Sequence, residues 1–211
     1  MADRIRHAPE DLARRYGAAA SVWGDKMRAL GYFDAYCGFL AATAPHAPSG
    51  IRVLDIGAGT AAFAEAWLTT VASDTAMTLL DPSPEMLAAG AARLAARGVA
   101  ADTAQVMLED YAARAPFDVL LAAHVLEHDP DPAQMLRTMR NLVRPGGRLW
   151  LVVSKPHWCN AIVWLQWRHR SYRPETVRTL LATSGWHLTA EHAFRSGPPS
   201  RTSRGYLVEA R

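Results

Sequence analysis

The chain has 211 residues, half of them apolar, and a formal net charge of +3. This length and composition suit a single domain over residues 1–211 with one sizeable core. The apolar runs are shorter than the roughly 18–20 residues of a membrane span, and residues 1–10 lack the apolar core of a signal peptide. The net charge is modest, and charged residues of one sign do not form blocks in the sequence, which argues against a nucleic-acid partner. We therefore expect a cytoplasmic protein.

Residues 1–48 are predicted to form a helical cap that precedes the sheet. Apolar side chains recur at spacings of three and four within 11–20 and 26–42, as in helices with one buried face. The inward positions of the second helix are predicted to include Met27, Leu30, Phe33 and Leu40. A proline-containing stretch that ends at Gly50 then links the cap to the first strand.

A strand, a glycine turn and a helix start follow one another in residues 53–63, Val-Leu-Asp-Ile-Gly-Ala-Gly-Thr-Ala-Ala-Phe. This is the first half of a βαβ unit. Gly57 and Gly59 leave the turn without side chains, so a ligand can approach the backbone of Gly57, Ala58 and Gly59 closely.

Two ligands compete for this turn. The six residues from Gly57 satisfy the relaxed dinucleotide fingerprint, in which a pyrophosphate lies on the helix N-terminus. Asp55 would repel a diphosphate, whereas a carboxylate suits a ligand that carries an ammonium group. S-adenosylmethionine has an ammonium group, a sulfonium and a ribose but no phosphate, so it is the expected cofactor. A nicotinamide dinucleotide remains the alternative.

Residues 53–60 resemble the first motif of class I S-adenosylmethionine-dependent methyltransferases, Asp-x-Gly-x-Gly at the end of the first strand. The third glycine usual in that family is Ala61 here. The resemblance implies an α/β fold: a Rossmann-like three-layer αβα sandwich with a mostly parallel seven-stranded sheet and a cofactor-binding core in 51–155. It also implies that cap helices lie over the cofactor, where Tyr16 and Trp23 are candidates because aromatic faces attract a sulfonium.

The predicted second strand supplies another acid. It ends at Asp81, about where an acid reaches the ribose hydroxyls. Ser83 is expected to cap the next helix, with Pro84 at its first position. Pro82 and Met86, which adjoin this acid, are also assigned to the cofactor site.

The predicted third strand, 104–108, is followed by two acids and a tyrosine. Methyltransferases that resemble this chain place an acid here to accept from the adenine amino group. Asp110 is the first choice and Glu109 the alternative, and Tyr111 is grouped with them. A solvated loop acid is the competing interpretation.

Residues 117–123 form a nearly continuous apolar run, as expected of a strand covered on both faces. The His-Val-Leu-Glu-His of 124–128 follows it and resembles a stretch of many small-molecule methyltransferases at this place. Because ligands bind at strand carboxyl ends in such sheets, Ala123 and His124 are placed beside the cofactor.

His124 is the first candidate for a general base, and His128 and His157 are the next. A loop that these side chains merely position is the competing interpretation. A metal site is disfavoured, because helical zinc sites carry the order His-Glu-x-x-His.

The C-terminal third, 156–211, is assigned to the substrate side and to an antiparallel hairpin that closes the sheet. A helix is predicted at 131–143, and the fifth strand at 148–153 follows it. A helix at 174–184 and strands at 186–194 and 205–210 complete the chain, with a turn-rich connection between the last two.

Three tryptophans, two histidines and two arginines gather in 157–170. This segment can line a pocket for a flat, apolar substrate, lie on a membrane surface, or cover the sheet or a dimer partner. A peripheral membrane or homodimer contact is assigned to residues 158–167.

The predicted activity is transfer of a methyl group to an oxygen, nitrogen or carbon of a small molecule. A general base is required only if the acceptor is a hydroxyl. A nicotinamide-dependent oxidoreductase and a non-catalytic cofactor-binding scaffold or partner subunit remain the alternatives.

Overall fold

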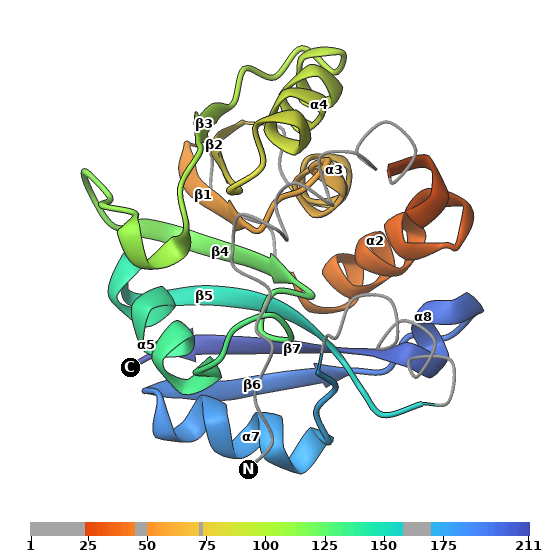
Figure 1. Cartoon of the computed structure of the whole chain (residues 1–211), viewed down its shortest axis with the longest axis vertical. Coiled ribbons are helices and arrows are strands. Elements are labelled where there is room, and N and C mark those ends of the chain that lie inside the picture. The colour runs from red at the N-terminus through yellow and green to blue at the C-terminus, as the bar shows by residue number, and fades with distance from the viewer. Residues whose placement is uncertain (1–23, 45–49, 72–73, 158–169) are drawn as a thin grey trace, which may run out of the picture.

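A single mixed sheet with the strand order β3-β2-β1-β4-β5-β7-β6 forms the centre of the molecule (Figure 1). The computed structural model describes residues 24–44, 50–71, 74–157 and 170–211. The strands are β1 (Ile51–Ile56), β2 (Thr75–Leu80), β3 (Asp102–Ala104), β4 (Phe117–Ala123), β5 (Val143–Ser154), β6 (Trp186–His192) and β7 (Ser203–Ala210). Only the pairs that involve β7 are antiparallel. The predicted fold class, including the closing hairpin, is confirmed.

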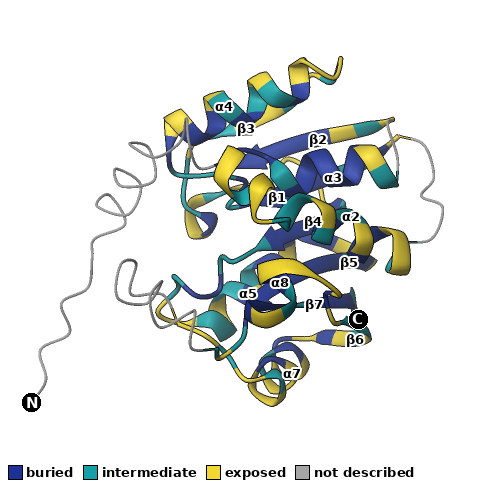
Figure 2. Ribbon diagram, turned by 90° about the vertical axis from the view of Figure 1, so that its right-hand side faces the viewer, coloured by how far each residue is buried: buried dark blue, intermediate teal, exposed yellow. Residues whose placement is uncertain are grey.

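Helices cover both faces of this sheet, because successive residues of its central strands are apolar and point to opposite sides. On one face, Val119 and Leu121 of β4 join a core with Phe63 and Trp67. On the other face, the intervening residues of β4 pack against the helix after that strand. Figure 2 shows the buried strands between partly exposed helices. The helices are α2 (Tyr32–Thr43), α3 (Ala62–Thr70) and α4 (Pro84–Ala95) on the first face, and α5 (Pro132–Leu142) and α7 (Pro174–Thr183) on the second.

The start of α4 agrees with its sequence signals. The Ser83 hydroxyl accepts a hydrogen bond from the Met86 amide at 3.3 Å, and Pro84 occupies the first turn. This cap satisfies one of the amide donors that a helix leaves without an internal partner. The predicted cap at Ser83 is confirmed.

Three elements between residues 102 and 202 differ from the prediction. β3 pairs with β2 only through residues 102–104, and residues 108–110 form a 3₁₀ turn, η1 (Leu108–Asp110), instead of the strand predicted at 104–108. β5 begins at Val143 rather than 148, because its pairing with β4 jumps across 144–147. The turn-rich connection contains a short helix, α8 (Gly197–Thr202).

The helical cap is broken where one helix was predicted. Residues 24–29 are helical, but Gly31 adopts a left-handed φ of 83°, and α2 begins after it. Leu30, predicted to face inward, lies at this break and is 37% exposed. Leu40 is buried as predicted. Tyr16 and Trp23 lie outside the described residues.

The strand order reverses between β1 and β4. The connections that leave the carboxyl ends of β2, β1 and β4 therefore lie side by side at one edge of the sheet. Open α/β sheets bind their ligands at such a switch point. None of the helices that the structure describes is long and apolar enough to cross a membrane.

Candidate functional site

The turn after β1 is built from left-handed backbone at three alternate positions. The φ angles are 61° at Gly57, 52° at Gly59 and 59° at Ala61. A Cβ atom on Gly57 would overlap Cγ1 of Val125 in the loop after β4, whereas one on Gly59 would meet no atom within 4 Å. Packing against Val125 therefore excludes a side chain at position 57, whereas the backbone at Gly59 faces open space.

Ala61 keeps the conformation that usually favours glycine, and its methyl group is fully buried. Space for that methyl exists because residue 90 of α4 has no side chain. A Cβ atom on Gly90 would lie 3.1 Å from the Ala61 Cβ. The methyl group that replaces the usual third glycine thus packs beside a glycine of α4, where a Cβ atom would also lie 3.1 Å from the Gly59 carbonyl oxygen.

Asp81 joins the glycine turn to the start of α4. Its Oδ2 accepts from the Gly59 amide and its Oδ1 from the Ser83 amide, both at 2.9 Å. Burial raises the pKa of this carboxyl, and the two amides oppose the rise. The acid expected at the ribose therefore also shapes the turn. Met86 beside it is buried and Pro82 is half-buried, and cofactor contacts by all three residues remain predictions.

Asp55 is buried at the end of β1 and caps the neighbouring helix. Its Oδ2 accepts from the Ala64 amide at 3.0 Å, in the first turn of α3, which has no cap from its own N-cap side chain. Burial raises the pKa of Asp55 to about 8, although the Ala64 amide opposes this. The predicted contact with an ammonium group is not tested, and such a cation would favour the charged carboxylate.

The residues expected at the adenine lie in η1 and directly after it, and their contact with adenine remains a prediction. Glu109 and Asp110 are exposed in η1. Burial raises the pKa of Asp129 in the loop after β4, and Glu109 adds to this rise, so the charge of Glu109 reaches that loop. The ring of Tyr111 lies 6.5 Å from that of Phe117, at the other end of β4 from the candidate base.

His124 is held tightly at the carboxyl end of β4. Its backbone has a left-handed φ of 59°, and its amide donates to the Val152 carbonyl at 2.8 Å. Its Nδ1 lies 3.0 Å from Ser154 Oγ and 3.2 Å from Glu127 Oε1. A strained backbone maintained by such contacts is typical of functional sites.

Glu127 fixes the hydrogen-bonding roles of this histidine. Its side chain is fully buried, and its Oε1 also accepts from the Ser154 amide at 2.6 Å. Burial raises the pKa of Glu127, but the hydrogen bond and charge of His124, together with the bonds from Ser154, outweigh it and leave the pKa below its ordinary value. The ionised carboxylate can only accept, so whenever His124 is neutral its proton lies on Nδ1 and its Nε2 is an acceptor.

Nε2 of His124 and Oε2 of Glu127 are both buried, and neither has a hydrogen-bond partner among the residues that the structure describes. Buried polar atoms without partners are rare because each costs about 1–3 kcal/mol. A ligand that donates a hydrogen bond to Nε2 would remove one of these costs.

Two tyrosines of α2 line this region. The Tyr32 ring meets the His124 ring edge-on at 5.6 Å, and its hydroxyl lies 3.0 Å from Thr202 Oγ1. The buried Tyr36 ring lies 4.7 Å from that of Phe63 in α3. Sequence reasoning missed both tyrosines, as it missed the roles of Glu127 and Ser154. The spacing of four residues within the predicted cap helix was the available signal for the tyrosines.

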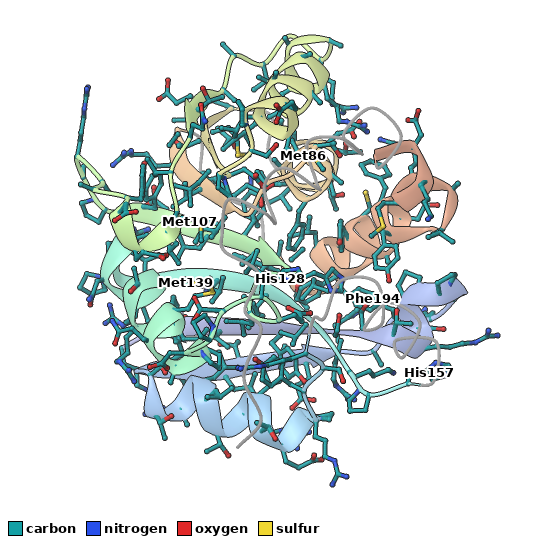
Figure 3. All side chains as sticks on the ribbon, in the orientation of Figure 1. Met86, Met107, His128, Met139, His157 and Phe194 are labelled. Atoms are coloured by element: carbon teal, nitrogen blue, oxygen red, sulfur yellow. The ribbon has the colours of Figure 1, made fainter. Side chains whose placement is uncertain are left out.

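The three candidate bases do not come together. Figure 3 shows His128 near the ends of β4 and β5, and His157 well apart from it, near α8. The structure therefore brings His124 and His128 to the site and leaves His157 outside it. Over 24–44, 50–71, 74–157 and 170–211, no three His, Cys, Asp or Glu side chains gather as a metal site.

Methyltransferases are among the known proteins that resemble this chain in sequence or structure. Residues 54–149 match a family model described as a methyltransferase domain. A ubiquinone biosynthesis O-methyltransferase of Pseudomonas aeruginosa is 38% identical over 105 residues, which cover 49% of this chain and 44% of the relative. This chain thus spans less than half the length of that curated relative.

Two solved structures share the fold. Magnesium protoporphyrin IX methyltransferase of Synechocystis PCC 6803 with bound S-adenosylmethionine has a TM-score of 0.70 at 16% identity, and the match covers 99% of this chain and 100% of that chain. Mitomycin 7-O-methyltransferase has a TM-score of 0.76 at 20% identity, over 97% of this chain and 61% of that chain. At these identities the likeness shows the Rossmann-like fold.

The two glycines of the turn are expected to differ in their tolerance of alanine. Gly57→Ala adds overlap with Val125 to an unfavourable φ, and the expected loss in the free energy of unfolding is roughly 2–4 kcal/mol. Gly59→Ala has only the backbone cost, about 1 kcal/mol. Urea denaturation measures both losses. The double variant Gly57→Ala/Val125→Ala should recover part of the first loss, and no recovery would contradict the overlap.

The buried carboxyl of Asp55 should make stability depend on pH. Because folding raises its pKa from 3.8 to about 8, the folded chain keeps a proton that the unfolded chain releases between these values. Its contribution to stability therefore falls as pH rises across that window. Asp55→Asn removes this loss, on the order of a few kcal/mol, while an amide oxygen can still accept from Ala64.

The measurement is Tm at about pH 5 and about pH 8. Asp55→Asn should lose less Tm between these values than the wild type, and the exposed Asp102→Asn should behave as the wild type. Parallel curves for Asp55→Asn and the wild type would show that Asp55 does not titrate in this window.

Proposed function

We propose that this chain is an S-adenosylmethionine-dependent methyltransferase that acts on a small-molecule hydroxyl. The observation that carries the proposal is the meeting, at one switch point, of an open glycine turn and a buried histidine nitrogen that has no partner in the described part of the chain. The matched family model over 54–149 and the fold shared with a structure that contains S-adenosylmethionine support the same class of activity.

The glycine turn and the acids around it suit the proposed cofactor. The backbone of 57–59 would take the amino-acid end, with Asp55 near the ammonium group and Asp81 near the ribose. Glu109 or Asp110 would accept from the adenine amino group, and Ala123 would adjoin the cofactor. The open space at Gly59 lets a ligand approach the main chain, which a side chain there would prevent.

S-adenosylmethionine supplies a methyl group on a good leaving group, so the protein mainly has to align the acceptor and exclude water. His124 Nε2 accepts the proton of the acceptor hydroxyl while the oxygen bonds to the methyl carbon. Glu127 stabilises the resulting imidazolium through Nδ1, and Ser154 holds the pair in place. Tyr32 packs on the ring and limits its rotation.

The class of acceptor is the finer part of the proposal. An acceptor that donates a hydrogen bond satisfies the Nε2 acceptor, and the relative in Pseudomonas aeruginosa is an O-methyltransferase by name. We therefore favour a hydroxyl on a flat, largely apolar small molecule. The contact assigned to 158–167 with a membrane or a second copy lies outside the described residues.

Calorimetric titration separates the proposed cofactor from the dinucleotide alternative. S-adenosylhomocysteine is expected to bind the full chain and NADH is not, because Asp55 can pair with an ammonium group, which NADH lacks at this position. If NADH binds and S-adenosylhomocysteine does not, the oxidoreductase hypothesis is established instead. Transfer of labelled methyl groups to a panel of phenols, amines and activated carbons then tests catalysis, and binding without turnover on the panel would favour the scaffold reading.

Loss of the proposed base should slow methyl transfer without weakening cofactor binding. His124→Gln is expected to lower kcat for a phenolic acceptor by about 10²–10⁴-fold. Glu127→Gln should lower it less, because Nε2 remains present but the imidazolium loses its counter-charge. The dissociation constant for S-adenosylhomocysteine should stay within about threefold of the wild-type value. This corresponds to a change in the free energy of binding under about 1 kcal/mol.

The exposed His187→Gln serves as the matched control and should retain wild-type kcat. Full activity in His124→Gln would remove the general base from the proposal, and the acceptor would then be a neutral amine or an activated carbon.

A further inference from the structure

One carboxylate on the first face of the sheet is surrounded by three arginines. Glu65 lies in the first turn of α3, and its side chain is 9% exposed. Its oxygens lie 2.6 Å from Arg28 Nη2, 3.3 Å from Arg93 Nη1 and 3.6 Å from Arg97 Nη1. The cluster is separate from the candidate base and carries more positive than negative charge.

The three arginines come from two different parts of the chain. Arg93 lies in α4 and Arg97 just after it, so both connect Glu65 to the same helix. Arg28 lies in the helical residues 24–29 and connects them to α3. Its guanidinium also stacks 3.9 Å above the Phe33 ring of α2. Among the described contacts of Glu65, Arg28 is thus the one that reaches the cap.

The same part of the cap lies directly against the glycine turn. Gly24 is buried, and a Cβ atom there would lie 2.6 Å from Arg93 Nη2 and 2.9 Å from Thr60 Oγ1. Thr60 belongs to the turn itself. The chain then continues into α2, whose Tyr32 reaches His124. Residues 24–36 therefore pass from the glycine turn to the candidate base.

We propose that Arg28 is a positioning residue: through Glu65 it seats residues 24–36 over the cofactor turn, and its loss weakens cofactor binding although it contacts no cofactor. This inference rests on the proposed function. Without Arg28, part of the population has the cap displaced, and the apparent dissociation constant rises by the inverse of the seated fraction. Because Arg28 and Arg97 are partly exposed, salt screens these ion pairs.

The test compares two variants that each remove one arginine from the same carboxylate. Arg28→Gln is expected to raise the dissociation constant for S-adenosylhomocysteine by about three- to fivefold, the range of an exposed ion pair. Arg97→Gln should change it by less than about twofold, because it does not hold the cap. Arg28→Lys keeps the charge and should restore most of the affinity. Calorimetry on the full chain measures all three.

Two further readouts separate positioning from general damage. KM for S-adenosylmethionine should rise in Arg28→Gln while kcat at saturation stays near the wild type. About 0.5 M NaCl should weaken binding to the wild type and have a smaller effect on Arg28→Gln. A lowered Tm with unchanged affinity would mark a purely structural role and overturn the inference.

Equal dissociation constants for Arg28→Gln and Arg97→Gln would overturn this inference and leave the proposed function intact. A wild-type chain that does not bind S-adenosylhomocysteine would overturn both.

Discussion

Two aspartates, the buried Asp55 and the partly buried Asp81, support the shape of the site, because they hold the backbone of the turn between β1 and α3. Asp55 accepts from the Ala64 amide and Asp81 from the Gly59 amide. Three alternate positions of that turn have left-handed φ angles, and at Ala61 this conformation has a steric cost that glycine does not have. The two bonds over-determine this conformation. These hydrogen bonds join the glycine turn to the starts of α3 and α4. The loop after β4 packs against this turn, where Val125 lies close to Gly57.

The second half of the site depends on a different set of bonds. Glu127 binds both the Ser154 amide and His124 Nδ1, so the end of β4 and the end of β5 are joined by one buried charge. This arrangement gives the histidine a defined orientation and a defined acceptor nitrogen. The proposed chemistry needs from the protein this alignment and a base for the hydroxyl proton, because the reactivity of the methyl group is already present in the sulfonium.

Local patterns predicted the elements that local physics controls. β4 has the predicted bounds 117–123, because a run of apolar residues suits a strand buried on both faces. Ser83 followed by Pro84 predicted the start of α4. The strand predicted at 104–108 is wrong. β3 lies at the edge of the sheet and pairs with β2 only over 102–104, and the chain beyond it continues into η1.

The site was predictable only in part. Acids at strand ends and glycines in the turn have fixed spacings, so Asp55, Asp81 and His124 could be placed at one edge of the sheet. The contacts that organise them join residues far apart in the chain, such as His124 with Ser154 or Glu65 with Arg28, and no periodicity marks such pairs. Tyr32 was missed for the same reason, since its partner, His124, is far from it in the sequence although the two rings are in contact.

The pairing of Ala61 with Gly90 bears on how relatives of this chain should be compared. The two residues share one small volume between α3 and α4, and the methyl group occupies it from the α3 side. A substitution at either position therefore changes what the other can carry. When position 61 is considered alone, the missing third glycine looks like the loss of a motif residue. Compared as a pair, the two positions show a methyl group at 61 that packs where residue 90 has no side chain. Position 90 is constrained by the turn as well, because a Cβ atom there would also lie 3.1 Å from the Gly59 carbonyl oxygen.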